Sequence, residues 1–164
     1  MLISKKYGTF LALGGIVTDV DIKQDAAEEP NRCHDCNKCQ QACPLGALEQ
    51  PYVLDREKCL SSLLQTEQLP ESARSVMRNR VMDCEICQQA CPWNARHIEN
   101  PLPTETTIAF QNKIPAWEDF FYLANLVKLT EREYRETLGP LNTGIPYAIF
   151  HSNVLLAMEG LHNP

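Results

Sequence analysis

The cysteines of this chain have a spacing that indicates a specific chemistry, the binding of metal clusters. The 164 residues contain eight cysteines. The first group follows C-x2-C-x2-C-x3-C, ends in a proline, and consists of Cys33, Cys36, Cys39 and Cys43. The second follows C-x2-C-x3-C, also before a proline, and consists of Cys84, Cys87 and Cys91, with Cys59 upstream. Eight thiolates in this pattern supply the ligands of two 4Fe-4S clusters, and no thiol is left over.

The spacing also predicts how the ligands are shared. Two intervening residues let successive thiolates reach adjacent irons from one tight loop, and the proline ends the run because it fixes its own φ. In two-cluster bacterial ferredoxins the fourth cysteine of the first motif binds the other cluster. The same crossing here gives cluster A the ligands Cys33, Cys36, Cys39 and Cys91. It gives cluster B the ligands Cys43, Cys59, Cys84 and Cys87.

Three other interpretations of the cysteine pattern compete with redox clusters. Paired C-x2-C motifs can bind zinc, but zinc does not account for C-x3-C-P occurring twice. A disulfide framework requires an oxidising compartment, and the cysteine content is modest for that class. A purely structural role for the clusters stays open. Whether the clusters are redox-active or structural, we expect the region of the cysteine motifs to unfold without its metal.

Composition narrows the class of protein. The chain has 44% hydrophobic residues, a formal net charge of -6 and a pI of about 5.2, which suits one domain or one domain with an appendage. No segment is basic, so we expect no nucleic acid binding by this chain alone. The apolar stretch before residue 18 is broken by glycines and too short to span a membrane. We therefore expect a cytoplasmic protein, since a reducing compartment suits oxygen-sensitive clusters.

The regions outside the motifs predict a mostly helical α+β fold. We expect a β-hairpin over residues 7–20 around Gly14 and Gly15, a loop over 21–32, and a short strand at 52–54. The 24 residues from 60 to 83 form an insertion that small ferredoxins lack, and their spacing predicts two short helices meeting at Pro70. Three arginines in or near the second helix indicate a solvated face or a docking patch for an acidic partner or a phosphate backbone: Arg74, Arg78 and Arg80.

The last third of the chain predicts an extended connection over 98–116 and then helices. Apolar residues recur at helical spacing from Trp117, and Thr130 with Glu133 matches a capping box. A final amphipathic helix is indicated from Tyr147 to Leu161. The predicted organisation is a hairpin and linker (1–30), a ferredoxin-like two-cluster domain (31–100) and a helical extension (101–164). Among the histidines we expect no metal ligand, although His34 could tune its neighbouring cluster.

Several stretches resemble epoxyqueuosine reductases. These are CEICQQACPWN from Cys84, the long insertion, the N-terminal LISKKYGTFLALGGIVTDVDI and the C-terminal FHSNVLLAMEG, in which Ser152 stands where arginine is expected. The resemblance implies two 4Fe-4S clusters working with cobalamin to reduce an epoxide on a modified tRNA base. In that family a cobalamin-binding domain precedes the hairpin, and these 164 residues contain no segment like it. The resemblance therefore carries over the eight cysteines and the helical tail, with no catalytic residue.

The predicted function is single-electron transfer through the two clusters. We expect a redox partner protein that carries a corrinoid (cobalamin) centre as the acceptor, so the chain is better described as an oxidoreductase component than as a complete enzyme. The alternative is one part of a split epoxyqueuosine reductase-like enzyme, which would require a partner with the missing domain. In that case the hairpin should expose apolar surface.

Overall fold

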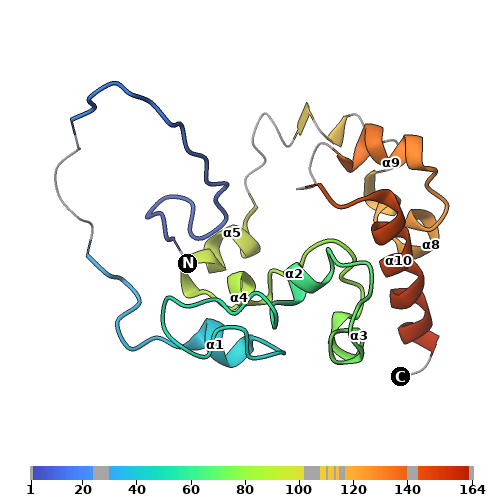
Figure 1. Ribbon diagram of the computed structural model, residues 1–164, viewed down its shortest axis with the longest axis horizontal. Helices are drawn as coiled ribbons and strands as arrows, with labels where there is room; N and C mark the ends of the chain where they lie inside the picture. The colour runs from blue at the N-terminus through green and yellow to red at the C-terminus, as the bar shows by residue number, and fades with distance from the viewer. Residues whose placement is uncertain are drawn as a thin grey trace.

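The fold is known from a computed structural model (Figure 1). It describes residues 2–23, 30–101, 108–109, 111–112, 114, 117–139 and 144–162. The helices of the cluster region are α1 (Lys38–Ala42), α2 (Leu60–Leu63), α3 (Glu71–Met77), α4 (Ile86–Gln89), the 3-10 turn η1 (Pro92–Asn94) and α5 (Ala95–Glu99). Those of the C-terminal part are α7 (Trp117–Phe120), α8 (Leu123–Leu126), α9 (Glu131–Thr137) and α10 (Tyr147–His162).

The hydrophobic core joins the insertion to the C-terminal helices. Helix α10 packs against α3, α8 and α9 (Figure 1). Phe150, Val154 and Ala157 lie on one face of α10, at a spacing of four and then three residues, and are at most 1% exposed. From the insertion the core takes Leu60, Leu64, Leu69, Ala73, Met77 and Val81. The core therefore forms beside the cysteine motifs and spans two of the segments predicted from the sequence.

Buried polar groups fix how these helices meet. Asn153 is 2% exposed, and its Nδ2 donates to the Leu64 carbonyl at 2.8 Å and to the Val81 carbonyl at 3.1 Å. The Tyr134 hydroxyl donates to the Ile145 carbonyl at 2.8 Å. Both carbonyls bound by Asn153 belong to the insertion, so this side chain attaches α10 to the chain between Cys59 and Cys84.

Most of the predicted helices are confirmed. Pro70 is the residue before α3, as its fixed φ favours, and α2 precedes it. The Thr130–Glu133 capping box is complete, with the threonine side chain accepting from the Glu133 N–H and the Glu133 carboxylate accepting from the Thr130 N–H. The helical periodicity from Trp117 forms two short helices, α7 and α8, because the chain is extended at Tyr122 (ψ 135°). Much of the connection predicted over 98–116 lies outside the described residues.

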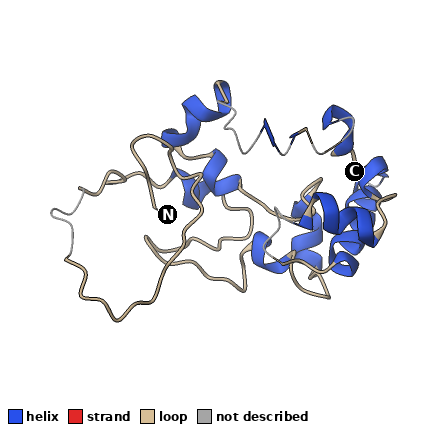
Figure 2. Ribbon diagram, turned by 90° about the horizontal axis from the view of Figure 1, so that it is seen from above, coloured by secondary structure: helices blue, strands red, loops and turns tan. Residues whose placement is uncertain are grey.

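The predicted α+β class and its N-terminal hairpin are wrong. The described residues contain no β-strand (Figure 2), only an isolated antiparallel bridge between Ser4 and Gly8. Strands require partners for their backbone groups and a surface to cover, and an isolated two-stranded hairpin is marginal. Here Leu13, Ile16 and Val17 are 74%, 93% and 101% exposed, so nothing in the described chain covers them.

The short strand predicted at 52–54 is also absent. Tyr52 has φ +66°, a left-handed conformation that ends extended structure, and the segment forms a turn beside the first cysteine motif. No helix in the described residues is both long and apolar enough to span a membrane.

A candidate two-cluster centre

The first cysteine motif is a tight turn followed by helix α1. The Cys36 N–H donates to the Cys33 carbonyl at 2.7 Å, and the Cys33 N–H donates to the Asn31 side chain at 2.9 Å. His34 lies inside this turn with φ +42°. Cys39 lies in α1 and Cys43 directly follows it, where the chain becomes extended. The short turn and helix thus present four thiols within eleven residues.

The second motif repeats this arrangement around helix α4. Glu85 has the left-handed conformation (φ +53°) and starts α4, which contains Cys87. Cys91 is the residue before η1, and its N–H donates to the Gln88 carbonyl at 3.1 Å. Helices α1 and α4 pack against each other. The contact brings together two motifs that are about fifty residues apart in the sequence.

The thiols influence one another in two groups. Burial raises the pKa of Cys91, and the charges of Cys33, Cys39 and Cys36 raise it further. Burial likewise raises the pKa of Cys87 to about 11, with further contributions from Cys84, Cys43 and Cys59. The pKa of Cys84 is raised by burial and then by Cys59 and Cys43. These groups have the same members as the predicted ligand sets A and B; the ligation itself stays a prediction.

Backbone amides point at the sulfurs and favour their ionised form. The Ala47 N–H lies 3.3 Å from Cys43 Sγ. Backbone hydrogen bonds from Ile86, Gln88 and Trp93 lower the pKa values of Cys84, Cys87 and Cys91 respectively, against the larger effect of burial. Amide hydrogen bonds to sulfur are a main determinant of cluster potential. Half-buried thiols that face amide donors therefore suit iron-sulfur clusters in both groups.

None of the eight cysteines is joined in a disulfide. Cys91 is buried, Cys36 is exposed and the other six are intermediate. In the part of the chain that the structure describes, no three His, Cys, Asp or Glu side chains lie close enough together to hold a single metal ion. The thiolates of a 4Fe-4S cluster each bind a different iron, so they stand further apart than the ligands of one ion. His151, on α10, contacts the Val127 carbonyl at 3.2 Å. This contact lies within the C-terminal helical part and not in the cysteine motifs.

Asn94 attaches the N-terminal segment to the second motif. Its side chain is 0% exposed, accepts from the Thr9 N–H and donates to the Thr9 hydroxyl and the Gln88 carbonyl, each at 2.7 Å. Gly8 (φ +65°) makes this contact possible, since a Cβ there would lie 2.0 Å from Asn94 Oδ1. Arg96 donates to the carbonyls of Lys5 and Lys6 at 2.5 Å. No local pattern in the sequence predicts these positioning contacts, although Asn94 closes the CPWN stretch.

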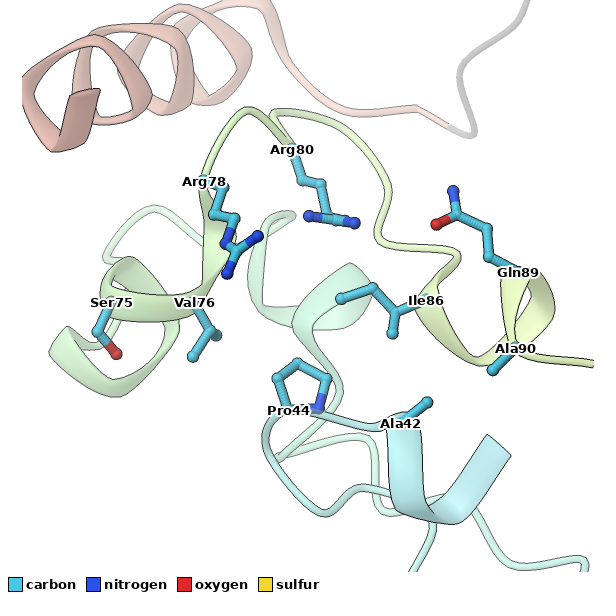
Figure 3. Close-up of a pocket in the computed structure, with 9 residues that line it drawn as sticks. All are labelled: Ala42, Pro44, Ser75, Val76, Arg78, Arg80, Ile86, Gln89 and Ala90. Carbon is cyan, nitrogen blue, oxygen red and sulfur yellow. The ribbon is translucent and has the colours of Figure 1, made fainter. Parts of the chain in front are cut away.

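Two hollows lie beside the cysteine groups. One of about 430 Å³ lies between α3 and the two motifs (Figure 3) and is lined by Ala42, Pro44, Ser75, Val76, Arg78, Arg80, Ile86, Gln89 and Ala90. The other, of about 390 Å³, is lined by Cys33, Tyr52, residues 2–5 and residues 30–32. Each hollow therefore borders a different end of the paired motifs, one near Cys43 and Cys87 and the other at Cys33.

Comparison with known proteins shows that the cysteine motifs are similar to those of iron-sulfur proteins. Residues 32–94 match the family described as the 4Fe-4S double cluster binding domain. The chain is 35% identical over 107 residues to an epoxyqueuosine reductase of Prochlorococcus marinus, which covers 63% of this chain and 33% of that protein. The chain thus spans about a third of the length of that relative.

Solved structures agree with the sequence matches. The structure of epoxyqueuosine reductase from Streptococcus thermophilus superposes with a TM-score of 0.75 and 29% identity, covering 99% of this chain and 41% of that one. An epoxyqueuosine reductase solved with an epoxyqueuosine-modified tRNA-Tyr stem loop superposes with a TM-score of 0.64 and 27% identity, covering 82% and 35%.

Proposed function

We propose that this chain passes single electrons through two clusters to a corrinoid centre on a partner. Residues 32–94 match the 4Fe-4S double cluster binding domain, and the chain is similar to part of the epoxyqueuosine reductases. The iron-sulfur domain and these relatives support a redox role. The observation that carries the proposal is the arrangement of eight free thiols in two groups of four.

Each thiol group would hold one cluster. Cys33, Cys36, Cys39 and Cys91 would hold cluster A, and Cys43, Cys59, Cys84 and Cys87 would hold cluster B. When bound, the clusters supply reversible one-electron chemistry. The chain's own residues provide the thiolates, the amide donors that stabilise them, and the contact between α1 and α4 that keeps both groups in one unit. Free thiols and oxygen-sensitive clusters also suit the cytoplasmic location that we propose.

The exposed apolar segment supports a partner protein. Between residues 10 and 22, Leu13, Ile16, Val17, Val20 and Ile22 are each at least 67% exposed. Apolar side chains gathered in this way mark interaction surfaces, and an extended backbone can add to the edge of a sheet. The segment directly follows Thr9, which Asn94 anchors to the second motif. A corrinoid-binding subunit seated there would lie near the clusters.

The exposed apolar segment also favours a second candidate function. In this candidate the chain is one part of an epoxyqueuosine reductase-like enzyme that acts on queuosine-modified tRNA. The similarity to the Streptococcus thermophilus enzyme extends over 99% of the chain. The two candidates differ in what the partner must supply. An electron carrier reduces a corrinoid without tRNA, whereas the enzyme component forms product only with both a cobalamin-binding partner and the modified tRNA.

The test is anaerobic reconstitution, followed by iron analysis, an EPR-monitored redox titration and reduction of added cob(II)alamin. We expect about eight irons per chain, reversible low-potential signals and cob(II)alamin reduction faster than with the reductant alone. Zinc in place of iron, or clusters that cannot be reversibly reduced, would refute the proposal. Product from modified tRNA only in the presence of a cobalamin-binding partner would favour the second candidate.

A further inference from the structure

The hollow between α3 and the two motifs has a positive lining in an acidic chain. Its nine lining residues include two arginines, Arg78 and Arg80, and no carboxylate (Figure 3), whereas the whole chain has a net charge of -6. The acidic residue nearest to these arginines in the sequence, Asp83, is engaged by other groups. The Asp83 carboxylate accepts from the Ser61 hydroxyl at 2.5 Å and from the Cys84 N–H at 2.8 Å.

Among the described residues, both guanidinium groups have N–H donors without a partner. Arg80 Nε donates to the Cys84 carbonyl at 3.0 Å, and no described residue bonds to its two terminal nitrogens. The exposed Arg78 side chain has no hydrogen-bond or ion-pair partner in the described part of the chain. Planar guanidinium groups in this state can bind carboxylates in bidentate fashion. The hollow can therefore accept an acidic ligand, and the described residues place no carboxylate in it.

Arg78 also occupies a backbone position that favours glycine. It has φ +51° and ψ -119° at the end of α3, in a turn closed by the Arg80 N–H on the Met77 carbonyl at 2.9 Å. A non-glycine residue in such a conformation is strained, and strain of this kind concentrates at functional sites. An arginine at this position points its charge over the hollow (Figure 3).

The hollow is lined by residues adjacent to cysteines of the second thiol group, which is Cys43, Cys59, Cys84 and Cys87. Pro44 follows Cys43, Ile86 precedes Cys87, and Arg80 binds the Cys84 carbonyl. Its other lining side chains include Val76 and Ala90, so an apolar floor is combined with an arginine rim, which is the composition of a protein docking site. A redox protein seated here would be as close to cluster B as the ligand loops allow, and electron transfer falls steeply with distance.

We propose that this hollow is the docking site of the electron donor, an acidic one-electron carrier protein whose surface carboxylates bind Arg78 and Arg80. The reduced carrier would give up one electron and become oxidised by one unit. Cys43, Cys59, Cys84 and Cys87 would hold the cluster that takes up this electron, and no bond would form or break. The inference rests on the proposed function, names its electron donor and assigns cluster B as the point of entry.

The test compares charge-reversed variants of the reconstituted chain. Reduction by a reduced flavodoxin is followed by stopped-flow absorbance, and the affinity of the oxidised flavodoxin is measured by calorimetry. We expect Arg78→Glu to lower both the second-order rate and the affinity by about tenfold, Arg78→Lys to retain most of each, and the wild-type rate to fall as salt rises. The control is Arg56→Glu, the same charge change at an exposed arginine outside the hollow.

Three outcomes would overturn the inference. Equal effects of Arg78→Glu and Arg56→Glu would do so, as would a salt-independent wild-type rate. A third is that Arg78→Glu weakens binding of a tRNA anticodon stem loop while leaving flavodoxin reduction unchanged, since the patch would then serve RNA. Reduction by photoreduced deazaflavin, a small neutral reductant, separates this failure from failure of the proposed function. If deazaflavin reduces the clusters of every variant, only the docking site is in question.

Discussion

Asn94 Oδ1 accepts a hydrogen bond from the backbone N–H of Thr9 at 2.7 Å, although 85 positions separate the two residues in the sequence. Through this contact the second cysteine motif holds the start of the exposed apolar segment. The position of the segment on the cluster region therefore depends on this buried side chain, together with Arg96, which binds the carbonyls of Lys5 and Lys6.

Replacing Asn94 by alanine should release the N-terminal segment. The change removes three hydrogen bonds and leaves buried donors and acceptors unpaired, so we expect local destabilisation of about 2–3 kcal/mol. Hydrogen exchange at the Thr9 amide should become markedly faster. The exposed Asn100→Ala serves as control. Unchanged protection of Thr9 in Asn94→Ala would show that other contacts hold the segment.

Asn153→Ala should destabilise the packing of α10 against the insertion (residues 60–83). The variant leaves the carbonyls of Leu64 and Val81 without their donor, at a cost of about 2–3 kcal/mol. Thermal unfolding under anaerobic conditions should show a lower Tm. Ser152→Ala changes the exposed neighbouring residue and should stay within about 0.5 kcal/mol of wild type. Similar Tm values for the two variants would contradict the role of Asn153.

The crossed ligand sets make a spectroscopic prediction. Cys43→Ser should alter the same EPR signal as Cys87→Ser, and Cys39→Ser the same signal as Cys91→Ser. A variant that loses its cluster should fall from about eight irons to about four. If Cys43→Ser instead altered the signal that Cys39→Ser affects, the ligands would not be crossed.

Removing the clusters should unfold the motifs and spare the helical core. Within residues 31–58 only Ala47 is a buried hydrophobic residue, and it lies outside the core cluster. Metal ligation therefore supplies most of the cohesion of these loops. After chelation, hydrogen exchange should become fast in both motifs while the amides around Phe150 and Val154 stay protected. Simultaneous loss of protection throughout would mean that the chain unfolds as one unit.

Arg78→Gly should stabilise the chain while weakening carrier docking. Glycine relieves the left-handed conformation of residue 78, which we expect to raise stability by about 1 kcal/mol and Tm by a few degrees. Arg74→Gly is the contrast, because it places glycine inside α3 and also removes the hydrogen bond from Arg74 Nε to the Leu69 carbonyl, so it should cost about 1 kcal/mol or more. A lower Tm for Arg78→Gly would show that the arginine stabilises its own turn.

The helices that the sequence predicts well are those set by local chemistry. Pro70 and the Thr130–Glu133 capping box mark helix starts through contacts within one turn, and the apolar positions of α10 share one face, so the periodicity identifies them. The strand predictions failed for the opposite reason. β-propensity at Ile16 and Val17 reflects packing against neighbours, and the described residues supply no neighbour there.

The sequence alone determined the iron-sulfur chemistry, because thiolate number and spacing specify the ligands whatever surrounds them. Only the tertiary structure decided which distant segments meet. It placed Asn94 on Thr9 and Asn153 on the insertion, contacts that no local pattern encodes because each partner is a backbone group found at almost every residue. It also placed two arginines over a hollow beside Cys43 and Cys87, since the left-handed turn at Arg78 and the packing of α1 against α4 set that geometry together.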